Sequence, residues 1–299
     1  MVGFGSSRGK AKNNQLADIL RTAVEINNVQ ALKHAIRMGA NLNHEFRNGY
    51  TVLHIAVERG SNDVLKYLCA MDHIAIDAHT HLLMTPLSIA VQENKLVAAQ
   101  ILMGYGADPN TPIVFEQNVV HVAAHNQNHT MLHEVITNGA EVNIIDCFDQ
   151  SPLSISILMV PNRRITRILL EAGADPNFKS KSNMSILTEA ILTENVFHHF
   201  KVIRTLIEYG ANVNDVDEIK RETPLHKAAA VGNATILIYL IERGANLLSV
   251  NVYGQTPLDV ARMHGHERCT EILTFLEENA IEEELRMLEA KHGRELPDK

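Results

Sequence analysis

A four-residue pattern recurs along the chain at a nearly constant interval, and it limits the architectures that the chain can adopt. In its clearest copy, Thr223-Pro-Leu-His226, Thr can cap a helix, Pro fits the first helical turn, and Leu begins an apolar stripe at helical spacing. Gly232 ends this helix, and a second apolar helix over Ile236–Ile241 ends at Gly244, which is suited to a left-handed C-cap. Neither helix can bury its apolar face alone, so units of this kind must stack.

The pattern occurs seven times, and its copies begin at Thr51, Thr85, Asn118, Ser151, Ser185, Thr223 and Thr256. Successive copies are 33 or 34 residues apart, except for a 38-residue step before Thr223. A constant period of this length, with a turn and two helices in each period, is typical of one repeat type stacked many times. A single array can therefore account for a chain of 299 residues.

This sequence resembles the ankyrin-repeat family over residues 15–273. The resemblance rests on the seven copies and on closing turns of the form Gly-Ala-Asp/Asn or Gly-Ala-Glu, which begin at Gly39, Gly106, Gly139, Gly173, Gly210 and Gly244. It implies an all-α solenoid of about eight helix-turn-helix repeats with short hairpin-like fingertips, in which the first and last repeats act as caps. We therefore expect a flexible N-terminal tail over residues 1–14, the repeat array over 15–273, and an acidic amphipathic C-terminal helix and tail over 274–299.

The 38-residue step places extra residues near Val196–Phe200, between the two helices of the sixth repeat. Insertions in solenoids often form loops that bind partners. The alternative is a longer second helix that buries both phenylalanines, and the sequence leaves these two interpretations open.

Composition excludes several classes of function. A net charge of −8 argues against nucleic acid as the main partner, because phosphate binding needs clustered Lys and Arg. The sequence contains no run of eighteen apolar residues, so it predicts no membrane span. Cys69, Cys147 and Cys269 lie far apart without a Cys-x-x-Cys motif, which indicates free thiols in a reducing compartment. We therefore expect an intracellular, cytoplasmic protein, with the nucleus as a second location.

The sixteen histidines do not form a metal or catalytic motif. His54, His121 and His226 occupy the fourth position of the pattern, where the resemblance implies a structural role. His125, His129 and His133 have helical spacing, but the loop at Asn126–Asn128 is expected to break the helix between them. Because phosphate-binding and nucleophile motifs are also missing, we expect no enzyme activity, no metal, no cofactor and no small-molecule substrate.

In the family, the turn that precedes each copy of the pattern projects as a fingertip, and the helix that begins at the pattern is the inner helix of its repeat. The resemblance implies that the fingertips and the ends of the inner helices contact partner proteins. The residues of these positions that we predict to bind a partner are Tyr50, Leu82, Met84, Phe115, Phe148, Met159 and Tyr253. Leu82, Phe115 and Phe148 lie on three consecutive fingertips, and a contiguous exposed apolar patch usually marks an interaction site. The alternative is that these side chains fold onto neighbouring turns.

The function that we expect is protein binding in the concave groove by a monomeric scaffold, adaptor or inhibitor. The alternative is a substrate-recognition subunit of a ubiquitin ligase that recruits the ligase through the C-terminal helix. Some arrays of this family are hydroxylated on the Asn that closes the turn when Leu lies eight residues earlier. Asn110, Asn177 and Asn214 match this arrangement, although each could simply hydrogen-bond its own turn.

Overall fold

The computed structural model describes residues 5–159, 161–181, 183–193 and 196–292, and the side chains of 5–12, 196–199 and 280–292 lie outside that description. The chain forms two compact units. Unit 1 is Met1–Val160 with Arg167–Ala174, and unit 2 is Pro161–Thr166 with Asp175–Lys299.

Unit 1 consists of helix pairs joined by projecting loops. Its helices are α1 (Gly5–Glu25), α2 (Val29–Arg37), α3 (Val52–Arg59), α4 (Asn62–Cys69), α5 (Pro86–Gln92), α6 (Leu96–Gly104), α7 (Val119–His125), α8 (His129–Thr137), α9 (Pro152–Ser154) and the π-helix η3 (Ile155–Met159). Two 3-10 turns, η1 (Arg47–Gly49) and η2 (Val114–Glu116), lie in the loops, and α10 (Arg163–Glu171) contributes residues to both units. The break between α7 and α8 falls at Asn126–Asn128, as predicted.

Unit 2 has the same construction. Its helices are α11 (Ile186–Leu192), α12 (Val196–Glu208), α13 (Pro224–Val231), α14 (Ala234–Glu242), α15 (Pro257–Met263) and α16 (Glu267–His292). Among the described residues the loops contain no strand, only an isolated antiparallel bridge between Lys179 and Ser185. The predicted all-α repeat solenoid is confirmed.

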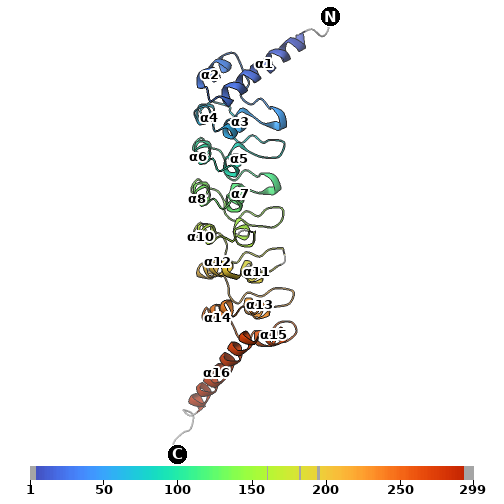
Figure 1. Cartoon of the computed structure of the whole chain (residues 1–299), viewed down its shortest axis with the longest axis vertical. Helices are drawn as coiled ribbons and strands as arrows, with labels where there is room; N and C mark the ends of the chain where they lie inside the picture. Colours follow the sequence, from blue (N-terminus) through green and yellow to red (C-terminus); the bar gives the residue numbers. More distant parts are fainter. Residues whose placement is uncertain (1–4, 160, 182, 194–195, 293–299) are drawn as a thin grey trace, which may run out of the picture. The chain divides into compact units, whose positions relative to one another are not determined.

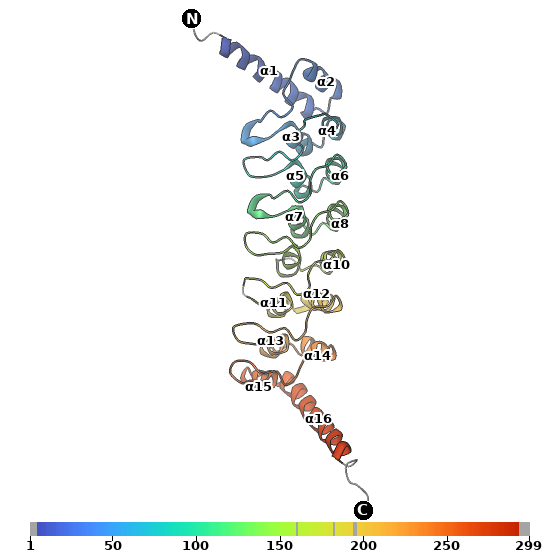
Figure 2. The same ribbon diagram turned by 180° about the vertical axis from the view of Figure 1, so that it is seen from behind.

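Within each unit, stacking of the first helix of one repeat on the first helix of the next builds the core. In unit 1, α3 packs on α5 and α5 on α7, while α4 packs on α6 in a second column (Figures 1 and 2). The third residue of every copy of the pattern is buried: Leu53, Leu87, Val120, Leu153, Leu187, Leu225 and Leu258. Small buried residues such as Ala90 and Ala228 let neighbouring helices approach closely.

The first residue of each copy caps its helix, as its type predicts. The Thr85 hydroxyl accepts from the Ser88 backbone N–H (3.1 Å), while the Ser88 hydroxyl accepts from the Thr85 N–H (2.8 Å). In unit 2, His226 replaces the serine as the acceptor for the capping residue, because its Nδ1 accepts from the Thr223 N–H (3.1 Å). Each inner helix therefore begins at a fixed residue, which sets where the preceding fingertip lies.

Each fingertip is a tight turn closed by a backbone hydrogen bond and a left-handed residue. In the loop before α5, the Thr80 N–H donates to the Met84 carbonyl (2.9 Å), and Leu83 has φ of 58°. The equivalent left-handed residues in the other fingertips are Gly49, Glu116, Asp149, Asn183, Arg221 and Gly254. Asp149 and Asn183 tolerate this conformation, whereas on Leu83, Glu116 and Arg221 the repeated turn imposes a conformation that such side chains do not favour.

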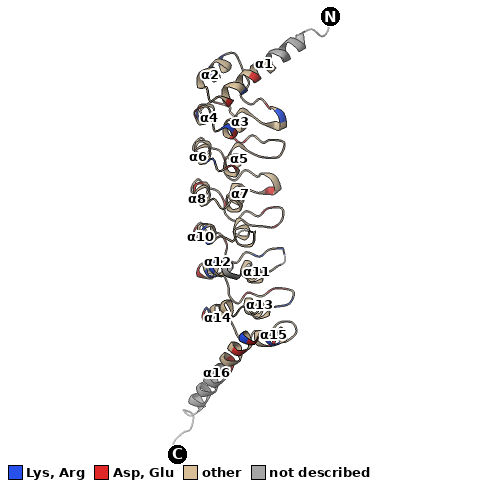
Figure 3. Cartoon of the chain, in the orientation of Figure 1, with Lys and Arg blue, Asp and Glu red and all other residues tan. Residues whose placement is uncertain are grey.

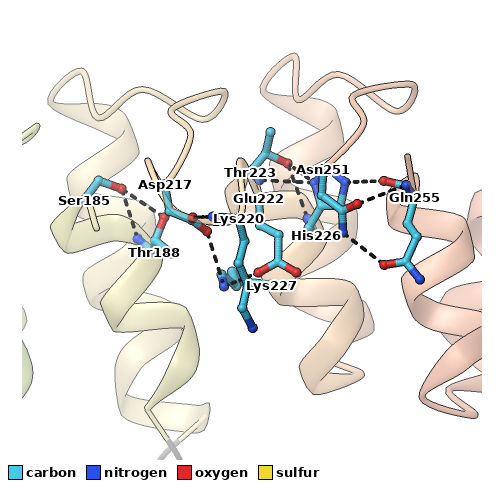
Figure 4. Close-up of polar contacts among 10 residues, drawn as sticks. All are labelled: Ser185, Thr188, Asp217, Lys220, Glu222, Thr223, His226, Lys227, Asn251 and Gln255. Carbon is cyan, nitrogen blue, oxygen red and sulfur yellow. Dashed lines mark hydrogen bonds and ion pairs between the residues drawn. The ribbon is translucent and has the colours of Figure 1, made fainter. Parts of the chain in front are cut away.

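Charged side chains form a cluster at the longer fingertip before α13 (Figure 4). The Asp217 carboxylate accepts from the Lys220 N–H at 2.5 Å and pairs with Lys227 Nζ at 3.5 Å. Lys227 also pairs with Glu222, and all three charged groups of this cluster are largely buried. One extra residue in the turn is thus accommodated by an internal ion-pair cluster.

The structure corrects the expected ends of the array. Residues 5–14 were predicted to be a flexible tail, but α1 begins at Gly5 and continues into the buried stripe of Leu16, Leu20 and Val24, because no Pro separates them. The C-terminal helix was predicted to begin after Leu273, but α16 runs unbroken from Glu267, because no closing Gly follows Leu273 until Gly293. Residues 1–4 and 293–299 lie outside the described residues, as do the side chains of the expected stripe from Ala280 onward.

The insertion near Val196–Phe200 is helical, so the longer-helix interpretation is correct for the backbone. Helix α12 has 13 residues, whereas α14 has nine. The Phe200 ring contacts the Tyr239 ring at 5.6 Å in an edge-to-face arrangement, and the side chain of Phe197 lies outside the description. The added residues therefore extend a packed helix.

The substitution Gly49→Ala should destabilise unit 1 more than Gly254→Ala destabilises unit 2. Both glycines have positive φ, 76° and 71°, which costs a Cβ-bearing residue about 1–2 kcal/mol. A Cβ on Gly49 would also lie 2.8 Å from the His81 backbone nitrogen, whereas one on Gly254 would meet nothing within 4 Å. Urea unfolding of both variants measures the difference, and equal midpoints would show that the close approach to His81 has no energetic effect.

Candidate protein-interaction site

Two aromatic side chains form the centre of the candidate site in unit 1. The Phe115 and Phe148 rings lie 5.4 Å apart in a tilted arrangement, although they belong to successive fingertips. The Cys147 N–H donates to the Phe115 carbonyl (2.9 Å), which ties the two fingertips together. Even with this contact, Phe115 is 54% exposed and Phe148 is 55% exposed. Mutual packing therefore leaves about half of each side chain in water.

An open groove of about 360 Å³ lies against these rings. Met84, from the fingertip before, and Met159, from the end of η3, line it together with both phenylalanines. The remaining walls are apolar side chains, amides and one imidazole: Ile113, Val114, Val122, Ile155, Gln92, Gln117, Asn126, Gln150 and His125. Four of the seven residues predicted from the sequence thus come together in one place.

The other three predicted residues do not line this groove. Leu82 is 73% exposed and stands on its own fingertip, while Tyr50 lines a separate pocket beside α3. Tyr253 is 70% exposed and belongs to unit 2. The candidate site is therefore concentrated in the third to fifth repeats.

The sequence prediction missed four apolar wall residues, although their repeat positions could have revealed them. Ile113 and Val114 immediately precede Phe115 in its fingertip, and Val122 and Ile155 each lie four residues after the start of the pattern. The prediction considered only two fingertip positions and the ends of the inner helices. A comparison of every position across successive repeats would have found the apolar character of these walls.

The three histidines of the pattern are structural, as the resemblance implied. His54 Nδ1 accepts from the Thr51 N–H (3.0 Å), and its Nε2–H donates to the Met84 carbonyl (3.1 Å) in the next fingertip. His121 makes the equivalent bond to the Gln150 carbonyl (3.2 Å). Because Met84 and Gln150 line the groove, these buried rings hold its walls in position.

Other reactive groups do not gather into a site. No group of three His, Cys, Asp or Glu side chains among the described residues is placed to hold a metal ion. Burial raises the pKa of the Cys69 thiol to about 12 and also raises that of Cys269, so both remain protonated near neutral pH. Cys147 is an exposed free thiol on the fingertip that carries Phe148.

The candidate hydroxylation residues link successive repeats. The Asn110 amide donates to the Gly139 carbonyl (3.0 Å) and accepts from the Glu141 N–H (2.7 Å). Asn177 and Asn214 make the same pair of bonds to the next closing turn. The amides therefore bond the closing turn of the next repeat, and hydroxylation stays a prediction.

The matches to known proteins cover the repeat region of the chain. A family profile described as ankyrin repeats in three copies matches residues 20–113, 120–217 and 195–283. The chain belongs to the ankyrin-repeat family. Ankyrin arrays generally mediate protein–protein interaction, and the fold itself is typically not catalytic.

Several relatives contain comparable arrays. The crystal structure of the ankyrin repeat domain of Bcl-3 superposes with a TM-score of 0.69 at 27% identity, covering 76% of this ankyrin-repeat chain and all of that domain. Human palmitoyltransferase ZDHHC13 is 24% identical over 81% of the chain, and the human transient receptor potential cation channel subfamily A member 1 is 25% identical, also over 81%. The chain spans 33% of the palmitoyltransferase and 22% of the channel, so the similarity concerns the repeats.

Within the described part of this ankyrin-repeat protein, none of the helices combines the length and apolar character needed to span a membrane.

The stability of the array should fall as the pH drops below about 6.5. Burial lowers the pKa of His54 to about 4 and also lowers those of His121 and His226. The unfolded chain, with ordinary His pKa values near 6.5, takes up these protons first, so acid favours unfolding until the folded pKa is reached. Each unit of depression makes about 1.4 kcal/mol of stability depend on pH.

Urea midpoints measured at pH 7.5, 6.5, 5.5 and 4.5 test this expectation. The variant His54→Gln should lose part of the decline between pH 6.5 and 4.5, although it is less stable at pH 7.5. An unchanged pH slope in the variant would show that other groups cause the decline.

Proposed function

We propose that this ankyrin-repeat chain is a non-catalytic binding module that holds an extended segment of a partner protein in the groove of unit 1. It would act as an intracellular scaffold, adaptor or inhibitor. The observation that supports this most strongly is the clustering of Met84, Phe115, Phe148 and Met159 around one open groove. Exposed apolar patches of this kind usually mark interaction sites on soluble proteins.

The chemistry of the groove favours a segment with an apolar side chain as its anchor. Burying an apolar side chain contributes about 1.5–3 kcal/mol, and aromatic rings and methionine are common at the centre of interfaces. The amides of Gln92 and Gln150 on the walls can hydrogen-bond the main chain of an extended segment. The exposed edges of Phe115 and Phe148 would then be covered by the anchor.

Fixed fingertips support the same proposal. His54 and His121 anchor the carbonyls of Met84 and Gln150, and the Phe115 carbonyl accepts from Cys147. A groove with a preset shape loses little conformational entropy when it binds. The free thiols are consistent with a reducing, intracellular setting.

A random ten-residue peptide library displayed on phage provides a test that requires no known partner. Selection on the wild-type chain should enrich peptides with a large apolar residue. Their affinity, measured by fluorescence anisotropy, should fall about tenfold or more in the double variant Phe115→Ser/Phe148→Ser, because the anchor loses its aromatic contacts.

The matched control is Phe275→Ser, which removes a phenylalanine of similar exposure, 66%, from α16 in unit 2. This variant should bind the selected peptides with wild-type affinity. Equal loss of affinity in the control, or undiminished binding by the double variant, would place the interaction elsewhere and overturn the proposal.

A further inference from the structure

A second pocket in unit 1 differs in chemistry from the apolar groove. It has a volume of about 380 Å³ and lies between α1, the fingertip before α3, and the end of α3. Three arginines line it, each from a different one of these elements: Arg21, Arg47 and Arg59. Folding therefore brings arginines from three elements to one pocket.

The two pockets are equivalent stretches of one repeating surface. Arg47 lies four residues before its copy of the pattern, as Val114 does in the apolar groove. Arg59 lies eight residues after the start of its copy, the place taken by Asn126 and Met159 in later repeats. A segment that runs along the inner face would therefore meet the arginines at the second repeat and the apolar walls from the third onward.

The charges in the arginine pocket are only partly balanced. Glu25 pairs with Arg21 Nε at 2.9 Å and lies 3.9 Å from Arg59. Glu58 lies beside Tyr50, whose pKa is raised by burial and then by the Glu58 charge. Among the described residues, no carboxylate oxygen lies within 4.0 Å of the Arg47 guanidinium, and the pocket keeps one positive charge in excess.

The fingertips beside the apolar groove carry the opposite sign. Glu116 and Asp149 lie next to Phe115 and Phe148, and no Lys or Arg lines that groove. Figure 3 shows basic colour on the fingertip before α3 and acidic colour on the fingertip before α7. A negatively charged group in a bound segment would thus be repelled at the apolar groove and attracted at the arginine pocket.

We propose that the arginine pocket binds the carboxylate of an Asp or Glu in the same partner segment, with Arg47 as the principal contact. This inference rests on the proposed function, because it assigns chemistry to the partner that occupies the groove. The planar guanidinium can donate two parallel hydrogen bonds to a carboxylate, which fixes geometry as well as charge. The bound segment then has a direction, with its acidic residue toward the second repeat and its apolar anchor against Phe115 and Phe148.

The phage selection also tests this inference. Peptides enriched on the wild-type chain should carry Asp or Glu at a constant offset on one side of the apolar anchor. Replacing that acid with its amide in a synthetic peptide should weaken binding about tenfold, since a hydrogen bond between two charged groups is replaced by one to a neutral group. The Arg47→Gln variant should bind the acidic peptide more weakly by a similar factor. It should bind the acidic and the amide peptide with equal affinity.

Arg37→Gln is the matched control, because it makes the same change at an exposed arginine of α2 that does not line either pocket. It should leave both affinities unchanged. Two results would overturn the inference and leave the proposed groove intact. One is selected peptides that share an apolar anchor but no acidic residue. The other is a difference in affinity between the acidic and amide peptides that persists in Arg47→Gln. A selection that enriches no apolar anchor would overturn both proposals.

Discussion

The structure depends on a hydrogen-bonded connection that recurs at the start of the inner helices. In its fullest form, the ring of His54 accepts from the backbone of Thr51 and donates to the carbonyl of Met84 in the following repeat. One side chain therefore caps a helix and also fixes the next fingertip. Because both ring nitrogens are buried and used, the loss of this ring would leave polar groups of two repeats without partners.

This connection, together with the backbone bonds of the turns, explains how exposed apolar residues can stay where they are. Phe115 and Phe148 stay about half exposed on their fingertips. Backbone bonds within and between the fingertips, together with the histidine bonds to Met84 and Gln150, hold the loops in place. The family fold thus maintains an apolar groove in water, and the sequence of each fingertip decides what the groove can bind.

Much of the architecture could be predicted from the sequence, because seven copies of the pattern carry a capping residue and six repeats end in a closing glycine. The ends were the exception. The charged and polar residues of 5–14 do not identify a helix alone, but they continue from a packed one, and α16 extends past Leu273 because no glycine stops it there. Composition alone did not show either continuation, and the sequence signal for both was the absence of a Pro before Leu16 and of a Gly between Leu273 and Gly293.

The site was harder to predict than the fold. Equivalent positions of the pattern identified Met84, Phe115 and Phe148, but the sequence could not show that their side chains meet around a groove with Met159 while Leu82 stands apart. The arginine pocket was missed because Arg21 lies in α1, in a repeat that lacks the pattern. Arg21 lies near Arg47 and Arg59 because α1 stacks on α3.

Hydrogen exchange with mass spectrometry on the chain with and without a phage-selected peptide tests the central claim most directly. We expect slower exchange in the fingertips at residues 113–117 and 146–150 and at the ends of their inner helices, with no change in α4, α6 or α8. Protection confined to those outer helices, or to unit 2, would contradict the claim that preset fingertips of unit 1 form the binding surface.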